Sequence, residues 1–168
     1  MNGILSMGDV LAYAGTAIGL VGAALAVGFA CYASGRGTGA AGEAGAGLLA
    51  EQPNMFGKVL IMQVLPGTQG LYGLVIFFLT LVQVGAIGGE GLMTLSMAQG
   101  ISVFAACLPM AFGGLTAIPQ GRVSAAAIGM MARQEEGMGK GITLCIIVEF
   151  YAILCLLASI LLLVNLGL

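Results

Sequence analysis

Long apolar runs, separated by short polar and glycine-rich stretches, are the main pattern along this chain. The runs cover residues 8–34, 55–85, 94–132 and 138–166. Each run exceeds the roughly 20 apolar residues that cross the hydrocarbon core of a bilayer as a helix. The pattern therefore predicts an all-α membrane protein with four transmembrane helices, in a single membrane domain over residues 1–168.

Composition agrees with a membrane location. Hydrophobic residues make up 60% of the chain and charged residues only 7%, whereas a soluble domain carries about 25% charged residues. Five basic residues form no patch, so we expect no nucleic-acid partner. The four cysteines lie in apolar runs without CxxC spacing, and we expect them to be buried as small hydrophobic residues: Cys31, Cys107, Cys145 and Cys155.

The polar stretches between the runs predict the connections and the orientation. Polar loops are expected at residues 36–54 and 133–140, and four glycines predict a turn between the second and third helices: Gly85, Gly88, Gly89 and Gly91. All five basic residues flank the first and last connections: Arg36, Lys58, Arg122, Arg133 and Lys140. Because basic residues collect on the cytoplasmic side, we expect both termini to lie outside.

An internal repeat divides the chain into two helical hairpins, at about residues 8–85 and 94–166. The pair Gly57-Lys58 matches Gly139-Lys140, and Gly35-Arg36 matches Gly121-Arg122. Aligning the Gly-Lys pairs places Gly67 opposite Glu149, so the first hairpin has no carboxylate at that position. The many small residues of the first and third helices favour close helix packing, either inside the chain or around the axis of a ring of copies.

Gly37, Gly39 and Gly42 form a GxGxxG sequence. A dinucleotide site needs this motif after a strand in a βαβ unit. A membrane helix precedes it here, so we do not interpret it as a nucleotide site.

Glu149 is the acidic residue that lies deep inside a predicted span. A charge there costs about 2.5 kcal/mol or more. An isolated buried carboxylate avoids this cost by taking up a proton or a cation. The sequence therefore predicts that the Glu149 carboxylate carries one proton or one monovalent cation.

A helix break is predicted in the second span at Pro66 and Gly67. Proline has no backbone N–H, so the carbonyl of Met62 loses its helical partner. Irregular backbone at membrane depth is tolerated where it lines a site. The main-chain carbonyl of Leu65 is therefore a candidate ligand.

The same region supplies further oxygen atoms. Thr68, Gln69 and Gln120 offer neutral side-chain oxygens beside Glu149, and Tyr72 can donate its hydroxyl to the carboxylate. A proton needs only the carboxylate, whereas an alkali cation needs its hydration shell replaced by several oxygens. The inventory favours Na⁺. The simpler interpretation, hydrogen bonds between helices, remains open for each neutral residue.

Three segments carry a resemblance: LPGTQGLYG (65–73), QGRV (120–123) and VEFYAIL (148–154). With the duplicated hairpins, they resemble the proteolipid K subunit of bacterial sodium-transporting V-type ATPases, over nearly the whole chain. The resemblance implies Na⁺ ligation by the Leu65 carbonyl, Thr68, Gln69, Gln120 and Glu149, with Tyr72 bonding the carboxylate. The sequence departs from the pattern of that family at two positions: Pro119, which could displace Gln120, and Phe150, where the family has a smaller residue.

The resemblance also implies a function and partners. Identical subunits would form a membrane rotor ring, loaded with ions at a stator membrane subunit that has half-channels, and turned by a central-stalk subunit at the cytoplasmic loops. Membrane lipid would surround the ring in the cell membrane of a bacterium. ATP hydrolysis would take place elsewhere, so no catalytic residue and no organic cofactor are expected. The alternatives are an H⁺-translocating proteolipid of the same fold and a small Glu-dependent drug/cation antiporter.

Overall fold

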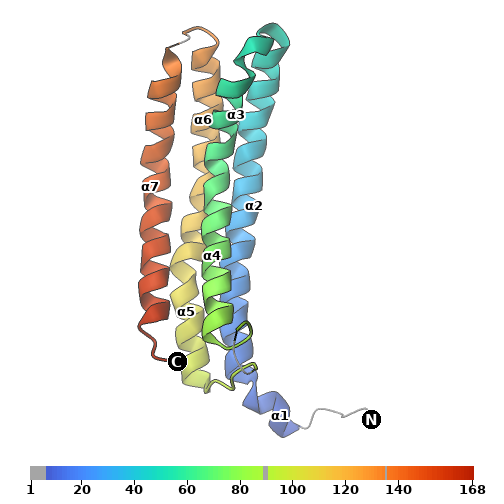
Figure 1. The fold of residues 1–168 in the computed structure, drawn as a ribbon, viewed down its shortest axis with the longest axis vertical. Coiled ribbons are helices and arrows are strands. Elements are labelled where there is room, and N and C mark those ends of the chain that lie inside the picture. The colour runs from blue at the N-terminus through green and yellow to red at the C-terminus, as the bar shows by residue number, and fades with distance from the viewer. Residues whose placement is uncertain (1–6, 89–90, 135) are drawn as a thin grey trace, which may run out of the picture.

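The computed structural model describes residues 7–88, 91–134 and 136–168, and these form an elongated helical bundle (Figure 1). The helices are α1 (Met7–Ala12), α2 (Ala14–Glu51), α3 (Phe56–Val64), α4 (Thr68–Gln83), α5 (Met97–Gly113), α6 (Ala117–Met131) and α7 (Gly137–Val164). Short 3₁₀ turns join some of them: η1 (Pro53–Met55), η2 (Leu65–Gly67) and η3 (Gly114–Thr116). No strand occurs among the described residues.

Four segments of this described chain are long and apolar enough to cross a membrane: Ala14–Glu51, Pro53–Gln83, Met97–Met131 and Gly137–Val164. The 3₁₀ turns join α3 to α4 and α5 to α6, so each pair forms one span. The predicted all-α fold with four spanning helices is confirmed. α1 and the C-terminal end lie at the same end of the bundle (Figure 1).

α2 and the α5–α6 span lie in close contact along most of their length. Glycines permit this approach because they place no side chain between the helices. A Cβ on Gly100 would strike the backbone of Gly15, and one on Gly121 would strike the backbone of Gly37. α4 packs on α2, while α7 packs on α5 and α6 and along a shorter stretch on α4.

The first predicted loop, residues 36–54, is wrong, because α2 continues without a break to Glu51. The 38 residues of α2 span about 57 Å at 1.5 Å per residue, well beyond a bilayer core of about 30 Å. Glycines are poor helix formers, but two of those in this stretch pack against side chains of α3: Gly42 meets Gln63 and Gly45 meets Val59. This tertiary packing outweighs the low helix propensity.

The second predicted loop is shorter than residues 133–140, because α7 already begins at Gly137. At the opposite end of the bundle, the predicted turn is present between α4 and α5. Gly85, Gly88 and Gly91 have φ values of 73°, 77° and 133°, which other residues rarely adopt. The remaining predicted turn glycine, Gly89, lies outside the described residues.

The cysteines are free thiols, and their burial differs from the expectation in one case. Cys107 and Cys145 are buried and Cys155 is partly buried, but Cys31 is exposed on the chain. The apolar sequence around Cys31 showed a lipid-compatible environment. It did not show that α4 covers this side of α2 only in part, at a contact where the Cys31 thiol donates to the Gly70 carbonyl at 3.8 Å.

Candidate ion-binding site

Glu149 lies near the middle of α7 and is 8% exposed. Among the acidic residues whose side chains the structure describes, it is the buried one. No group of three or more His, Cys, Asp or Glu side chains that could hold a metal occurs in the described part of the chain. Any cation held here therefore depends on one carboxylate and on neutral oxygens.

Both oxygens of the Glu149 carboxylate accept hydrogen bonds from other spans. The hydroxyl of Tyr72 in α4 donates to Oε1 at 2.6 Å, and Nε2 of Gln120 in α6 lies 3.4 Å from Oε2. Three spans therefore meet at this one carboxylate. Hydrogen bonds to an ionised group are roughly twice as strong as neutral ones, so these donors offset part of the cost of burying the charge.

The two glutamines are fully buried and bonded to each other. Nε2 of Gln69 donates to Oε1 of Gln120, and Nε2 of Gln120 donates to the carbonyl of Cys145 at 3.1 Å. The amide of Gln120 is thereby held between α4 and α7. In this arrangement, its nitrogen faces the carboxylate and its oxygen faces Gln69.

The oxygens of Leu65, Thr68 and Gln69 lie next to one another. The Thr68 hydroxyl donates to the Leu65 carbonyl at 2.9 Å and lies 3.4 Å from Oε1 of Gln69. The Thr68 backbone N–H also donates to the Leu65 carbonyl, which completes the η2 turn. The structure thus brings together all the residues that the sequence singled out as candidate ligands, with Tyr72 beside them.

The predicted helix break is present. Pro66 and Gly67 lie in the η2 turn between α3 and α4. The Met62 carbonyl, deprived of its usual donor by Pro66, accepts a hydrogen bond from the hydroxyl of Ser124 in α6. Sequence reasoning identified the orphaned carbonyl but missed the donor. The available signal was that Ser124 follows Gln120 by four residues and so shares its helix face.

Pro119 does not remove Gln120 from the site. It is the third residue of α6 and follows the η3 turn. Pro119 therefore lies where the span already departs from regular α-helical hydrogen bonding, and Gln120 stays buried at the site. The other departure, Phe150, is 55% exposed and points away from the site.

The first hairpin has a neutral contact in place of the carboxylate. Gly70 in α4 donates its backbone N–H to the hydroxyl of Ser34 in α2 at 2.8 Å. In the alignment of Gly35-Arg36 with Gly121-Arg122, Ser34 corresponds to Gln120. The contact therefore favours Gly70 as the counterpart of Glu149, rather than Gly67, which alignment of the Gly-Lys pairs gave.

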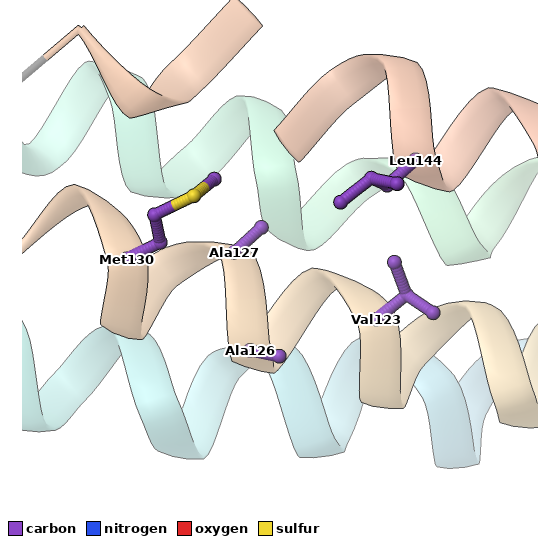
Figure 2. Close-up of a pocket in the computed structure, with 5 residues that line it drawn as sticks. All are labelled: Val123, Ala126, Ala127, Met130 and Leu144. Atoms are coloured by element: carbon purple, nitrogen blue, oxygen red, sulfur yellow. The ribbon is translucent and has the colours of Figure 1, made fainter. Parts of the chain in front are cut away.

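An apolar pocket of about 400 Å³ lies between α6 and α7 (Figure 2). Figure 2 shows side chains from both helices around it: Val123, Ala126, Ala127, Met130 and Leu144. None of them is polar or aromatic, and none belongs to the cluster around Glu149. The pocket therefore has no ligand for a cation.

The geometry around Glu149 suits the reversible capture of one cation. The groups gathered there are a carboxylate, two side-chain amides, a hydroxyl and a main-chain carbonyl, and their oxygens are the hard ligands that alkali cations bind. In this structure, hydrogen bonds among these groups satisfy them. A cation bound to Oε1 of Gln120 would require that amide to turn, and Gln69 with it, because the Gln120 oxygen now accepts from Gln69 and its nitrogen faces the carboxylate.

Comparisons with known proteins agree with this structure. The family model for the C subunit of ATP synthase matches the chain twice, at residues 21–80 and 104–162. The chain is 45% identical to V-type sodium ATPase subunit K of Enterococcus hirae over 152 residues, which cover 88% of this chain and 93% of that protein. It is 40% identical to A-type ATP synthase subunit K of Methanocaldococcus jannaschii over 148 residues, which cover 88% of this chain and 62% of that protein.

The two matched segments correspond to the two hairpins, so the predicted duplication is confirmed. The resemblance to rotary-ATPase proteolipids noted from the sequence motifs is confirmed as well. On the extent of these matches, the chain belongs to the family of the ATP synthase C subunit.

Proposed function

We propose that this chain is the ion-carrying rotor subunit of a V/A-type ATPase and that it binds Na⁺ at Glu149. The observation that carries the proposal is the convergence of Leu65, Thr68 and Gln69 oxygens beside Gln120 and a single buried carboxylate. A proton carrier needs only the carboxylate. The additional oxygens have a use when a hydration shell must be replaced.

In this proposal, identical copies form a ring, and each Glu149 receives its ion at a stator subunit with half-channels. Ion binding neutralises the carboxylate, so that the site can pass lipid at low cost. A basic residue of the stator would favour release on the other side. The chain itself hydrolyses no ATP, and a central-stalk subunit turns the ring.

The distribution of charge supports an orientation. Arg133, Lys140 and Lys58 lie at or near the end of the bundle that carries the α2–α3 and α6–α7 connections. The positive-inside rule makes that end cytoplasmic, with α1 and the C-terminus outside. The stalk subunit would contact the cytoplasmic end, and the cell membrane of a bacterium is the proposed location.

An H⁺-translocating proteolipid of the same fold is the competing proposal, and the name of the Enterococcus hirae relative favours Na⁺. The antiporter alternative has less support. The η2 break and the neighbouring Thr68 and Gln69 oxygens would have no role in an antiporter, and the apolar pocket in Figure 2 is separate from Glu149.

Labelling of Glu149 by a carboxyl-modifying carbodiimide tests the ion. The solubilised assembly is treated near neutral pH with NaCl, or with KCl at equal ionic strength, and the labelled residue is mapped by mass spectrometry. We expect NaCl to suppress labelling at Glu149 and KCl to leave it unchanged. Labelling that falls with rising pH but ignores NaCl would show a proton carrier.

A further inference from the structure

One face of α2 contacts α6 inside the chain, and the opposite face has no neighbour in the described chain. Gly121 presses on Gly37 of α2, as shown by the backbone atoms that a Cβ there would strike. On the opposite face of α2, a Cβ on Gly35 would meet nothing within 4 Å.

The same difference between the two faces of α2 is found further along the helix. Gly114 presses on Ala30 of α2, whereas Gly28, two residues from Ala30, has nothing within 4 Å of an added Cβ. The same is true of Gly39, four residues beyond Gly35. Gly35 and Gly39 each lie two residues from Gly37, or about 200° around the helix. This glycine edge therefore faces away from α5 and α6 of its own chain.

The α5–α6 span has an exposed edge of its own. Ala105, Phe112, Pro119 and Ala126 recur every seven residues, about two helical turns, and all four are exposed. Phe112 is 61% exposed. A protruding edge on one side of the chain and a side-chain-free edge on the other suit a heterologous contact, which generates rings when the rotation closes.

Arg122 lies next to this protruding edge and is exposed. It follows Gln120 by two residues, which is about 3 Å of rise and 200° of rotation. Arg122 is therefore close to the depth of the ion site, on the side of α6 that faces away from it. An arginine at the centre of a membrane span costs about 2.5–3.5 kcal/mol, and such residues almost always find a partner.

A complementary charge lies on the glycine edge of α2. A hollow of about 230 Å³ runs between Arg36 and Glu43, with Gly35, Gly39 and Ala40 as its floor. Glu43 is exposed, and no described residue forms an ion pair with it. The glycines leave room for an aliphatic stem, and Glu43 offers a carboxylate at the cytoplasmic end of the hollow.

The heights of the two charges agree. Gly37 and Gly121 touch, so residue 122 is level with residue 38 of α2. Rotation about a ring axis does not change height, so residue 122 of one copy is also level with residue 38 of the next copy. Arg122 of one copy then lies beside the hollow of its neighbour. Glu43 is five residues further toward the cytoplasm, about 7.5 Å along the helix, which is the direction in which an arginine reaches water.

We propose that the Gly28–Gly35–Gly39 edge of one copy receives the Phe112–Pro119 edge of the next, with Arg122 paired across the contact to Glu43. This inference rests on the ring assembly in the proposed function. Among the described residues, the contact between α2 and α6 inside the chain contains no ion pair. The ion pair therefore forms only at the junction between copies and discriminates it from the contact inside the chain.

Disulfide cross-linking tests the contact. In the full chain with its four cysteines replaced by alanine, Gly28→Cys and Phe112→Cys are introduced together and oxidised in the membrane. Because each copy carries both edges, the double variant should give a ladder up to the closed ring. Each single variant should give no ladder. Dimers from Gly28→Cys alone would overturn the proposal, since they would show α2 against α2.

Native mass spectrometry of the wild type and of the double-cysteine variant separates a failure of the proposed function from a failure of this interface. A wild-type protein that forms no ring would contradict the proposed function itself. Rings of full mass, with Na⁺-suppressed labelling of Glu149 but no ladder, would contradict only this interface.

A charge exchange tests the ion pair independently of cross-linking. Arg122→Glu and Glu43→Arg alone should each convert rings to monomers at a dodecyl sulfate concentration that leaves the wild type intact, and the double variant should regain most of the ring. Arg36→Glu with Glu43→Arg is the matched control and should regain none. If the double variant is as unstable as the two losses combined, the pair is refuted.

Discussion

The hydroxyl of Tyr72 donates to Oε1 of Glu149 at 2.6 Å, across 77 residues of sequence. The bond joins α4 of the first hairpin to α7 of the second. The first hairpin has no carboxylate of its own at this depth, so the two duplicated hairpins have different roles at the site. One hairpin supplies the charge, and the other supplies most of the neutral groups that hold it.

Replacing Tyr72 with phenylalanine removes this bond while keeping the ring of the side chain. Hydrogen bonds to charged groups contribute about 1.5–3 kcal/mol, so the carboxylate should lose its orientation. We expect the NaCl concentration that halves carbodiimide labelling of Glu149 to rise about tenfold or more, since 1.4 kcal/mol is a factor of ten. Tyr151→Phe is the control, because Tyr151 lies on α7, the helix of Glu149, but its side chain is exposed. An unchanged concentration in Tyr72→Phe would show that the bond has no role in ion binding.

Thr68→Val separates the Na⁺ and H⁺ proposals. Valine keeps the shape of threonine but removes the hydroxyl that lies beside the Leu65 carbonyl and Gln69. For a Na⁺ site we expect protection by NaCl to weaken at least tenfold, with labelling in the absence of Na⁺ unchanged. Thr80→Val is the matched control, because the buried Thr80 hydroxyl donates within its own helix to Ile76 at 2.8 Å. Equal protection curves for Thr68→Val and wild type would argue for a proton.

The membrane fold followed from the sequence because a bilayer permits few solutions. Uninterrupted apolar runs in lipid must be helical to satisfy their backbone groups, and this determined the four spans. The end of α2 could not be predicted in the same way. Residues 36–51 read as a glycine-rich loop, and only the contacts of Gly42 and Gly45 with α3 show why they stay helical.

The candidate site followed from the sequence to a similar degree. A lone carboxylate in a span and a Pro-Gly break are both costly features, and costly features at membrane depth indicate a site. What the sequence did not contain was the pairing between spans. Ser124 bonds Met62, and Gly70 bonds Ser34, and both contacts depend on how the hairpins are placed side by side.

A double-mutant cycle tests the hydrogen bond from the Ser124 hydroxyl to the Met62 carbonyl. Ser124→Ala should leave the Met62 carbonyl without a donor, which costs about 1–3 kcal/mol for a buried group. Pro66→Ala returns a backbone N–H to the same carbonyl. We therefore expect the loss of thermal stability from Ser124→Ala to be smaller in a Pro66→Ala background than in the wild type. Equal losses in the two backgrounds would show that the bond is not formed, because independent sites are additive.

The closest backbone approach between α2 and α6 predicts a strong effect from one methyl group. In Gly121→Ala, the new Cβ falls on backbone atoms of Gly37, which cannot move aside as a flexible side chain can. The two helices must separate, at a cost of about 1–3 kcal/mol or more. Because Gln120 is the adjacent residue, the same separation draws its amide away from Glu149. We expect both a lower midpoint of thermal unfolding and weaker protection of Glu149 by NaCl, although no ligand has changed. Gly139→Ala is the control, since its Cβ would meet nothing within 4 Å, and a Gly121→Ala variant that matched it in both measurements would contradict the close contact from which the position of Gln120 follows.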